Sequence, residues 1–363
     1  MKPTQALHDL GQSLWLDNIT RELLDSGTLA RYIRDLSVTG LTSNPTIFDE
    51  AIGKGSSYDA DIARLAASNA APEDIFLHLA IDDLRRAADL FRPAFEATGG
   101  VDGWVSLEVS PLLAADTQGT VAAAQDIHAR AARDNIFIKI PGTPAGVPAI
   151  EEAIWRGIPV NVTLLFSCDQ YLAAVDAYQR GLERRLEAGR PLQVASVASL
   201  FISRWDRAVA DRVPAALHNQ LGLAVGQQCY VAYREHLASP RWQRLSAAGA
   251  KPQRLLWAST GVKDPEASET LYIEALAAPD TIDTMPEKTL LAFAGSGRLG
   301  APLQADRDAV ARALRRFADA GVDAGALALQ LQADGAAAFV KSWQGLLKRI
   351  IDKSQPAKGA AAR

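Results

Sequence analysis

One lysine lies inside an almost wholly apolar run of the chain. Lys139 follows Ile-Phe-Ile and precedes Ile140 and Pro141. Burial strongly destabilises an ammonium group, so it favours the neutral amine, which attacks carbonyl carbons and forms Schiff bases. The alternative is a lysine on an edge strand, with its stem on apolar surface and its charged head in water. The other polar residues of the chain must decide between these interpretations.

Polar side chains also occur within or just after six other short β-rich runs. In chain order they are Asp17, Asn44, Glu108, Asn161 with Thr163, Ser199 with Arg204, and Ser259 with Lys263. Each alone has an ordinary explanation, such as helix capping, turn formation or a satisfied buried hydroxyl. Together with Lys139 they place a polar group at the end of seven runs. This pattern favours a buried, nucleophilic Lys139 over a lysine on an edge strand.

The β-rich runs alternate with amphipathic segments, as in βα units with a parallel sheet. We expect eight strands, at residues 14–19, 36–42, 104–109, 136–140, 160–166, 193–201, 254–259 and 281–285. Eight strands with intervening helices predict the α/β class and a (β/α)₈ TIM barrel, whose chemistry gathers at the C-terminal ends of the strands. An open doubly wound sheet is the alternative, but no phosphate-binding loop marks a switch point in it.

Additional helices should decorate the barrel. We expect helices at residues 73–96, 121–133, 170–187, 204–237, 265–277, 306–318 and 327–352, with further helices between Asn44 and Trp104. The last helix carries an apolar stripe and should pack across one end or side of the barrel. Residues 1–353 are expected to form a single domain, and residues 354–363, rich in Ala, Lys and Gly, a disordered tail.

The composition narrows the class of function. The 363 residues carry a formal net charge of −4, which argues against nucleic acid or an anionic membrane as a partner. The chain has no apolar stretch of membrane-spanning length and no signal-peptide core at its start. Its two cysteines, Cys168 and Cys229, suggest no disulfide framework, and its five histidines lack metal-ligand spacing. We therefore expect a cytoplasmic protein without a metal.

Two stretches resemble the signatures of the transaldolase family. Residues 40–48 (GLTSNPTIF) resemble one signature, and residues 136–143 (IFIKIPGT) resemble the other, which carries the Schiff-base lysine. The runs around Asp17, Glu108 and Thr163 are similar to the family as well. The resemblance covers nearly the whole chain and is closest to the longer bacterial transaldolases. It implies an enzyme without metal or organic cofactor that moves a dihydroxyacetone unit between sugar phosphates in the pentose phosphate pathway.

The resemblance also implies a role for each site residue. Lys139 would be the nucleophile, Asp17 the acid/base of carbon–carbon cleavage, and Glu108 a proton shuttle through a water held by Thr163. The residues that would bind substrate are Asn44, Asn161, Ser199, Arg204 and Lys263. The first three would contact the triose, and Arg204 the phosphate. Many members have a second arginine near Lys263, and a lysine lacks the planar fork of arginine.

Two alternatives to a transaldolase stay open. A fructose-6-phosphate aldolase of related fold would release free dihydroxyacetone, but Glu108 and Phe201 resemble the transaldolase pattern at positions where that enzyme tends to differ. A catalytically silent barrel could bind sugar phosphates or partner proteins, but it would gain nothing from a buried amine and two carboxylates. The sequence leaves open whether the chain is a monomer or a homodimer.

Overall fold

The computed structural model describes residues 2–355, and its centre is a closed barrel of eight parallel strands. The strands are β1 (Ser13–Asp17), β2 (Val38–Thr42), β3 (Trp104–Glu108), β4 (Ile136–Pro141), β5 (Val160–Leu165), β6 (Ser196–Phe201), β7 (Arg254–Ala258) and β8 (Ile282–Met285). Each strand pairs with the next, and β8 pairs with β1. The (β/α)₈ prediction is confirmed, and each of the eight predicted strands overlaps an observed one.

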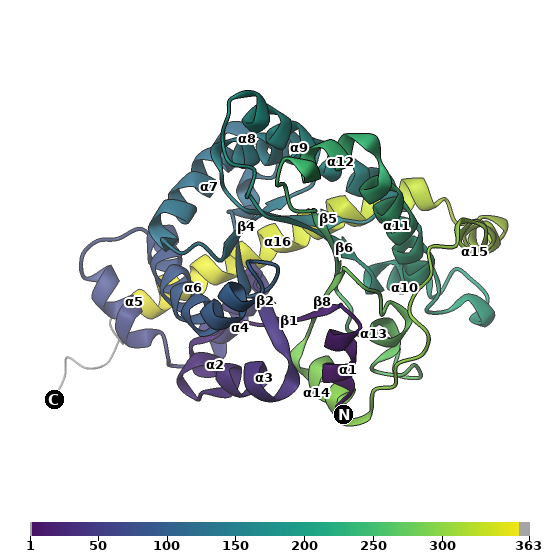
Figure 1. The fold of residues 1–363 in the computed structure, drawn as a ribbon. Helices are drawn as coiled ribbons and strands as arrows, with labels where there is room; N and C mark the ends of the chain where they lie inside the picture. Colours follow the sequence, from purple (N-terminus) through teal and green to yellow (C-terminus); the bar gives the residue numbers. More distant parts are fainter. Residues whose placement is uncertain (1, 356–363) are drawn as a thin grey trace.

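Helices surround the barrel on its outside (Figure 1). They are α1 (Pro3–Asp9), α2 (Arg21–Asp25), α3 (Thr28–Leu36), α4 (Pro45–Lys54), α5 (Asp59–Ala66), α6 (Pro72–Ala97), α7 (Thr117–Ala131), α8 (Gly146–Arg156), α9 (Cys168–Glu187), α10 (Ser203–Val209), α11 (Leu221–Ala238), α12 (Pro240–Ala247), α13 (Leu271–Ala275), α14 (Glu287–Ser296), α15 (Arg307–Asp319) and α16 (Ala324–Ser354). Two 3₁₀ turns, η1 (Pro111–Leu113) and η2 (Ala215–Leu217), are also present. No described helix is long and apolar enough to cross a membrane.

Several helix predictions need correction. The segment 204–237 is not one helix, because α10 ends at Val209 and α11 begins only at Leu221. Pro214 lies between them in an extended conformation, and proline supplies no N–H for a continuing helix. In the segment 265–277 only α13 is helical. The helix α16 includes Ser354, the first residue of the predicted tail, whereas residues 356–363 lie outside the described residues.

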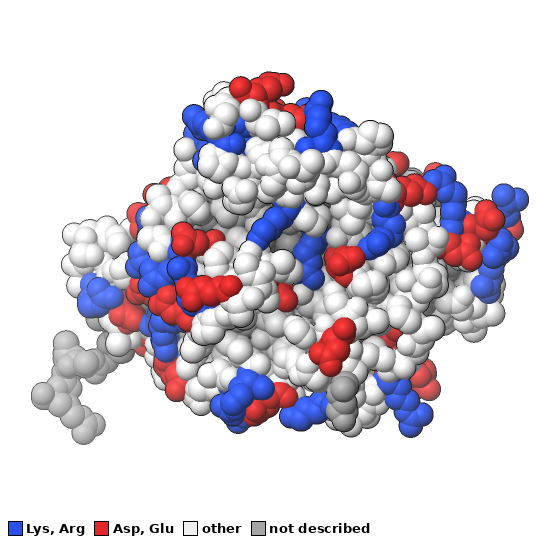
Figure 2. Space-filling view, viewed as in Figure 1, with Lys and Arg blue, Asp and Glu red and all other residues white. Residues whose placement is uncertain are grey.

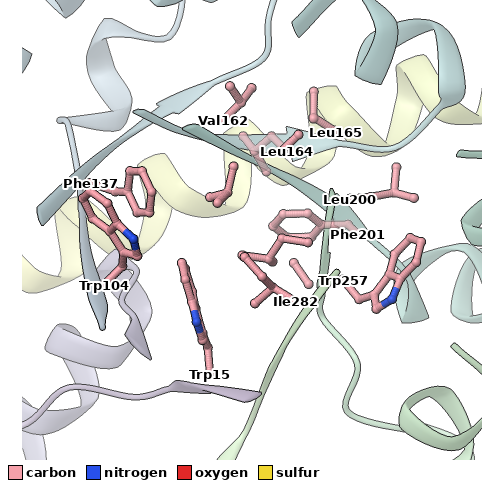
Figure 3. Packing of buried hydrophobic residues seen from close by; sticks show 14 of the residues in the cluster. Trp15, Trp104, Phe137, Val162, Leu164, Leu165, Leu200, Phe201, Trp257 and Ile282 are labelled. Carbon is pink, nitrogen blue, oxygen red and sulfur yellow. The ribbon is translucent and has the colours of Figure 1, made fainter. Parts of the chain in front are cut away.

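Aromatic rings fill part of the barrel interior (Figure 3). The rings of Trp104 and Phe137 stack with centroids 4.0 Å apart, and Trp15 lies 6.1 Å from Phe137. Side chains alternate along a strand, so Asp17 and Lys139, each two residues further on, share the face of Trp15 and Phe137. The rings therefore form a floor, and the polar residues follow toward the C-terminal ends of the strands.

The last helix crosses the barrel at those same strand ends. In Figure 1, α16 (yellow) passes behind the strands as one long rod. It packs on α4, α5 and α6. Its Gln332 side chain donates hydrogen bonds to Gly142 O at the end of β4 and to Leu164 O in β5, at 3.0 and 2.9 Å. The predicted packing of the C-terminal helix on the barrel is confirmed.

The charged residues on the surface are mixed in sign. Figure 2 shows lysine and arginine side chains interspersed with aspartate and glutamate over one face of the molecule. Exposed pairs such as Arg92 with Glu96 and Arg86 with Asp25 neutralise one another locally. Such pairs contribute only about 0–1 kcal/mol each to stability. No extended field of one sign covers the face in view.

Candidate active site

A cavity of about 130 Å³ lies at the C-terminal ends of the strands. Its walls include seven of the nine predicted site residues, namely Asp17, Asn44, Lys139, Thr163, Ser199, Arg204 and Lys263. The other two, Glu108 and Asn161, lie just beneath it, each in contact with a lining side chain. The structure therefore brings all nine predicted residues to one place.

Lys139 is buried between neighbouring strands. Its side chain is 7% exposed, its Nζ donates a hydrogen bond to Ser43 O at 3.0 Å, and Nζ lies 3.7 Å from Oε2 of Glu108. The parallel register of β3 and β4 places Glu108 directly beside Lys139. Because β4 has a paired strand on both sides and the amine is buried, the interpretation as an edge-strand lysine is wrong.

The carboxyl group of Glu108 is buried beside Lys139. Among the described residues, neither of its carboxylate oxygens has a hydrogen-bond partner, and neither does the buried hydroxyl of Thr163. Burial raises the pKa of Glu108 to about 7, and the nearby Lys139 only partly opposes this. Near neutral pH Glu108 can therefore both give and take a proton, as a proton shuttle must.

Asp17 is held in place at the end of β1. Its Oδ1 accepts a hydrogen bond of 2.8 Å from Thr42 Oγ1, and that hydroxyl lies 2.7 Å from Thr284 Oγ1. Burial raises the pKa of Asp17, while the charge of Lys139 and then the Thr42 hydrogen bond act in the opposite direction. Asp17 is thus a fixed carboxyl group on the cavity wall, and its raised pKa suits it to accept a proton.

Two amides belong to the site, Asn44 on the cavity wall and Asn161 beneath it. Ser199 Oγ donates to Asn161 Oδ1 at 2.7 Å, and Asn161 Nδ2 donates to Ser106 Oγ at 3.2 Å, so this amide has a fixed orientation. Asn44 caps α4, because its Oδ1 accepts a hydrogen bond of 3.2 Å from Ile47 N. Capping leaves the NH₂ group of Asn44 for other partners.

Two cations lie on the cavity wall. Arg204, half-buried in the first turn of α10, has its guanidinium 4.9 Å from the ring of Phe201, 6.0 Å from that of Phe166 and 5.9 Å from that of Phe339. Burial lowers the pKa of Arg204. Neither Arg204 nor the exposed Lys263 forms an ion pair with any described residue. Two unpaired cations beside a small cavity can hold a dianion such as a phosphate group.

A wider cleft adjoins the cavity. It has a volume of about 590 Å³ and shares Asp17, Asn44, Arg204 and Phe339 with the smaller space. A substrate larger than a triose can therefore extend from the cavity into the cleft. No cluster of three or more metal-ligating His, Cys, Asp or Glu side chains occurs in the described part of the chain.

Sequence reasoning missed several residues of the site. They are Ser43, Thr42, Ser106, Thr284, Gln332, Gly335 and Phe339. Strand alternation could have found Ser106, which shares a face of β3 with Glu108 two residues later. No local signal indicates the residues of α16, because the sequence does not say which face of that helix meets the barrel.

Comparisons with known proteins give a consistent result. The family model described as Transaldolase/Fructose-6-phosphate aldolase matches residues 14–350. A transaldolase of Thermobifida fusca is 45% identical over 360 residues, covering 97% of this chain and 98% of its own length. Transaldolases of Parafrankia sp. and Thiobacillus denitrificans are each 44% identical, covering 97% and 96% of this chain and 98% and 100% of their own lengths.

Proposed function

Since this chain belongs to the transaldolase/fructose-6-phosphate aldolase family, we propose that Lys139 forms the Schiff base of its reaction. The activity is that of a transaldolase, which transfers a three-carbon dihydroxyacetone unit from a ketose phosphate to an aldose phosphate. One observation carries the residue assignment. The amine of Lys139 is buried at a small cavity, 3.7 Å from a carboxyl group whose pKa is raised to about 7.

The first half of the proposed cycle forms the iminium. The neutral amine of Lys139 adds to the ketone carbon of fructose 6-phosphate or sedoheptulose 7-phosphate, which gives a carbinolamine. Glu108 supplies a proton through a water held by Thr163, so that the hydroxyl leaves as water. The resulting iminium withdraws electrons from the bond between its α and β carbons, which is the bond to be broken. The two buried groups without hydrogen-bond partners among the described residues, Glu108 and Thr163, support this relay.

The second half breaks and remakes the carbon–carbon bond. Asp17 takes the proton from the hydroxyl on the β carbon, the electrons of the Cα–Cβ bond form the enamine double bond as the iminium nitrogen becomes neutral, and an aldehyde phosphate leaves. The triose stays on Lys139 as an enamine. The enamine then adds to the acceptor, glyceraldehyde 3-phosphate or erythrose 4-phosphate, and Asp17 returns the proton. The reverse of the first half releases the new ketose phosphate.

In this proposal different residues bind the triose and the phosphate of the substrate. Asn44, Asn161 and Ser199 form hydrogen bonds with the hydroxyl groups of the triose, and Arg204 with Lys263 binds the phosphate. The unpaired state of the two cations among the described residues supports the phosphate assignment. The cytoplasm is the proposed location, and the two free cysteines are in keeping with it.

Borohydride reduction in the presence of fructose 6-phosphate tests the nucleophile. The expected result is a triose adduct on Lys139, identified by mass spectrometry of the digested protein. Lys139→Ala should lose the adduct and the turnover, whereas Lys288→Ala, at a lysine with an 82% exposed side chain, should keep both. An adduct and turnover in the folded Lys139→Ala protein would overturn the assignment.

The acceptor distinguishes transfer from simple aldol cleavage. Release of glyceraldehyde 3-phosphate from fructose 6-phosphate should depend on added erythrose 4-phosphate and yield sedoheptulose 7-phosphate. Sustained release without an acceptor, together with free dihydroxyacetone, would instead identify a fructose-6-phosphate aldolase. A protein that binds the sugar phosphate and gives neither product nor adduct would be a silent barrel.

A further inference from the structure

Gly335 lies in the middle of the 31-residue helix α16. The atoms around it explain why this position has no side chain. A Cβ atom at this position would lie 2.9 Å from Nη1 of Arg204 and 2.9 Å from Cδ2 of Leu164. Real Cβ atoms do not approach other atoms so closely. Glycine is unfavourable in a helix interior relative to alanine, so its presence here indicates a packing requirement. That requirement is room for the Arg204 guanidinium and for the end of the Leu164 side chain.

The guanidinium of Arg204 is surrounded by aromatic rings and forms no ion pair with the described residues. The rings are those of Phe201, Phe166 and Phe339. Phe339 follows Gly335 by four residues, one turn further along α16, so both lie on the same face of the helix. Two residues of α16 therefore border a cation that belongs to another element.

We propose that α16 sets the phosphate specificity of the site by positioning Arg204. Gly335 leaves space for the guanidinium, and Phe339 supplies one of the rings that hold it. Both are positioning residues, because they act through Arg204. The inference rests on the proposed role of Arg204 in phosphate binding and adds to it the structural device that aims the guanidinium.

Gly335→Ala is the direct test, and α16 itself contains a matched control. At Gly345 the nearest atom to an added Cβ would be Asp49 Oδ1 at 3.5 Å, an ordinary contact, so Gly345→Ala adds the same methyl group without an overlap. In Gly335→Ala the ends of the Arg204 and Leu164 side chains must move. We expect the KM for fructose 6-phosphate to rise about tenfold, equivalent to one lost charge-assisted hydrogen bond, with little change in kcat. Gly345→Ala should behave as wild type.

Trapping with two different ligands separates positioning from general damage. Dihydroxyacetone has no phosphate, so borohydride should trap it on Lys139 at the same concentration in wild type and in Gly335→Ala. Trapping of fructose 6-phosphate should need a higher concentration in the variant. An equal loss for both ligands, or a wild-type KM in the folded variant, would overturn the inference.

Two further variants cover the remaining outcomes. If Gly335→Ala does not fold, Phe339→Leu tests the positioning of Arg204, because it removes one ring beside the guanidinium. An unchanged KM for fructose 6-phosphate in Phe339→Leu would then refute the inference. Arg204→Met tests the premise separately. If Arg204→Met has a wild-type KM, the phosphate role of Arg204 fails; if only Arg204→Met raises the KM, that role stands and the positioning by α16 fails.

Discussion

Lys139 and Glu108 become neighbours through the parallel register of β3 and β4, although 31 positions separate them in the chain. This juxtaposition puts an amine and a carboxyl group 3.7 Å apart in a buried site. A buried amine alone would have no proton donor or acceptor beside it, and a buried carboxyl group alone would have no nucleophile beside it. In the proposed mechanism the pair supplies a nucleophile with a proton donor and acceptor beside it, which both halves of imine formation require.

The raised pKa of Glu108 should make the protein less stable as the pH rises. The folded state holds a proton up to about pH 7, whereas the unfolded chain loses it near 4.5, so unfolding releases a proton between these values. The contribution of Glu108 to the free energy of unfolding is greatest below pH 4.5. It falls between pH 4.5 and about pH 7 and is constant above that range. Glu108→Gln removes this pH dependence. The difference in the free energy of unfolding, variant minus wild type, should therefore increase by about 2 to 3 kcal/mol from pH 5 to pH 8.

Urea denaturation of both proteins at several pH values measures this gain. Glu73→Gln, at an exposed position, is the control for exchanging a carboxyl for an amide. The same Glu108→Gln protein should lose about 10² to 10⁴ in kcat/KM, because an amide cannot shuttle protons. A gain in stability that is equal at pH 5 and pH 8 would contradict the protonated state inferred for Glu108.

The two cations of the proposed phosphate site, Arg204 and Lys263, should contribute unequally to the binding of fructose 6-phosphate. Arg204 is half-buried and unpaired among the described residues, so Arg204→Met should raise the KM for fructose 6-phosphate about 10- to 100-fold. Lys263 is exposed and screened by water, and Lys263→Met should raise that KM about fivefold or less. Steady-state kinetics and competitive inhibition by inorganic phosphate report both effects. A larger effect at Lys263 would reverse the assignment of the principal phosphate ligand.

Among the elements, the ends of β4 and β5 depend on α16. Leu164 has a left-handed backbone conformation, with φ of 58°, where the register between β5 and β6 shifts. Such a conformation costs roughly 1–2 kcal/mol in a residue with a side chain and needs support from its surroundings. Gln332 provides support by donating to Leu164 O and Gly142 O. Thr163 immediately precedes this irregular point and faces the cavity.

Gln332→Leu should therefore affect both stability and activity. It leaves two buried carbonyl groups without their donor, which should lower the free energy of unfolding by about 1–3 kcal/mol. It should also lower kcat, because β4 and β5 carry Lys139 and Thr163. Gln330→Leu, on the exposed face of the same helix, should change neither quantity appreciably. Equal effects of the two substitutions in denaturation and kinetics would show that the Gln332 hydrogen bonds are unimportant.

The sequence predicted elements well where one local pattern dominates. Buried parallel strands such as β4 and β5 are continuous apolar runs, and the few polar residues in them are conspicuous. The helix prediction for 204–237 failed because the apolar spacing continued past Pro214, whose backbone restriction outweighs that spacing. The site residues at strand ends were predictable because a barrel collects those ends at one rim. Gln332 and Gly335 were not, because tertiary packing alone determines which face of α16 meets that rim.

In the whole molecule, one helix serves both the core and the site. The ring of Trp343 meets that of Phe76 edge-on at 5.0 Å, and Phe76 meets Phe48 at 5.2 Å, which joins α16 to α6 and α4. One turn earlier on the same helix, Phe339 lines the cavity. The attachment of α16 to the core should therefore control the geometry of the proposed phosphate site, which lies outside that aromatic cluster.

Trp343→Ala tests this coupling between the core and the site. Trp343 is 2% exposed, and its truncation should lower the free energy of unfolding by about 3–5 kcal/mol. Because the loosened α16 carries Gly335 and Phe339, the KM for fructose 6-phosphate should rise under conditions where the variant is still folded. Leu329→Ala, at a 67% exposed position of the same helix, should stay within about 0.5 kcal/mol of wild type and keep its KM. A destabilised Trp343→Ala protein with wild-type KM would show that the core and the phosphate site are independent.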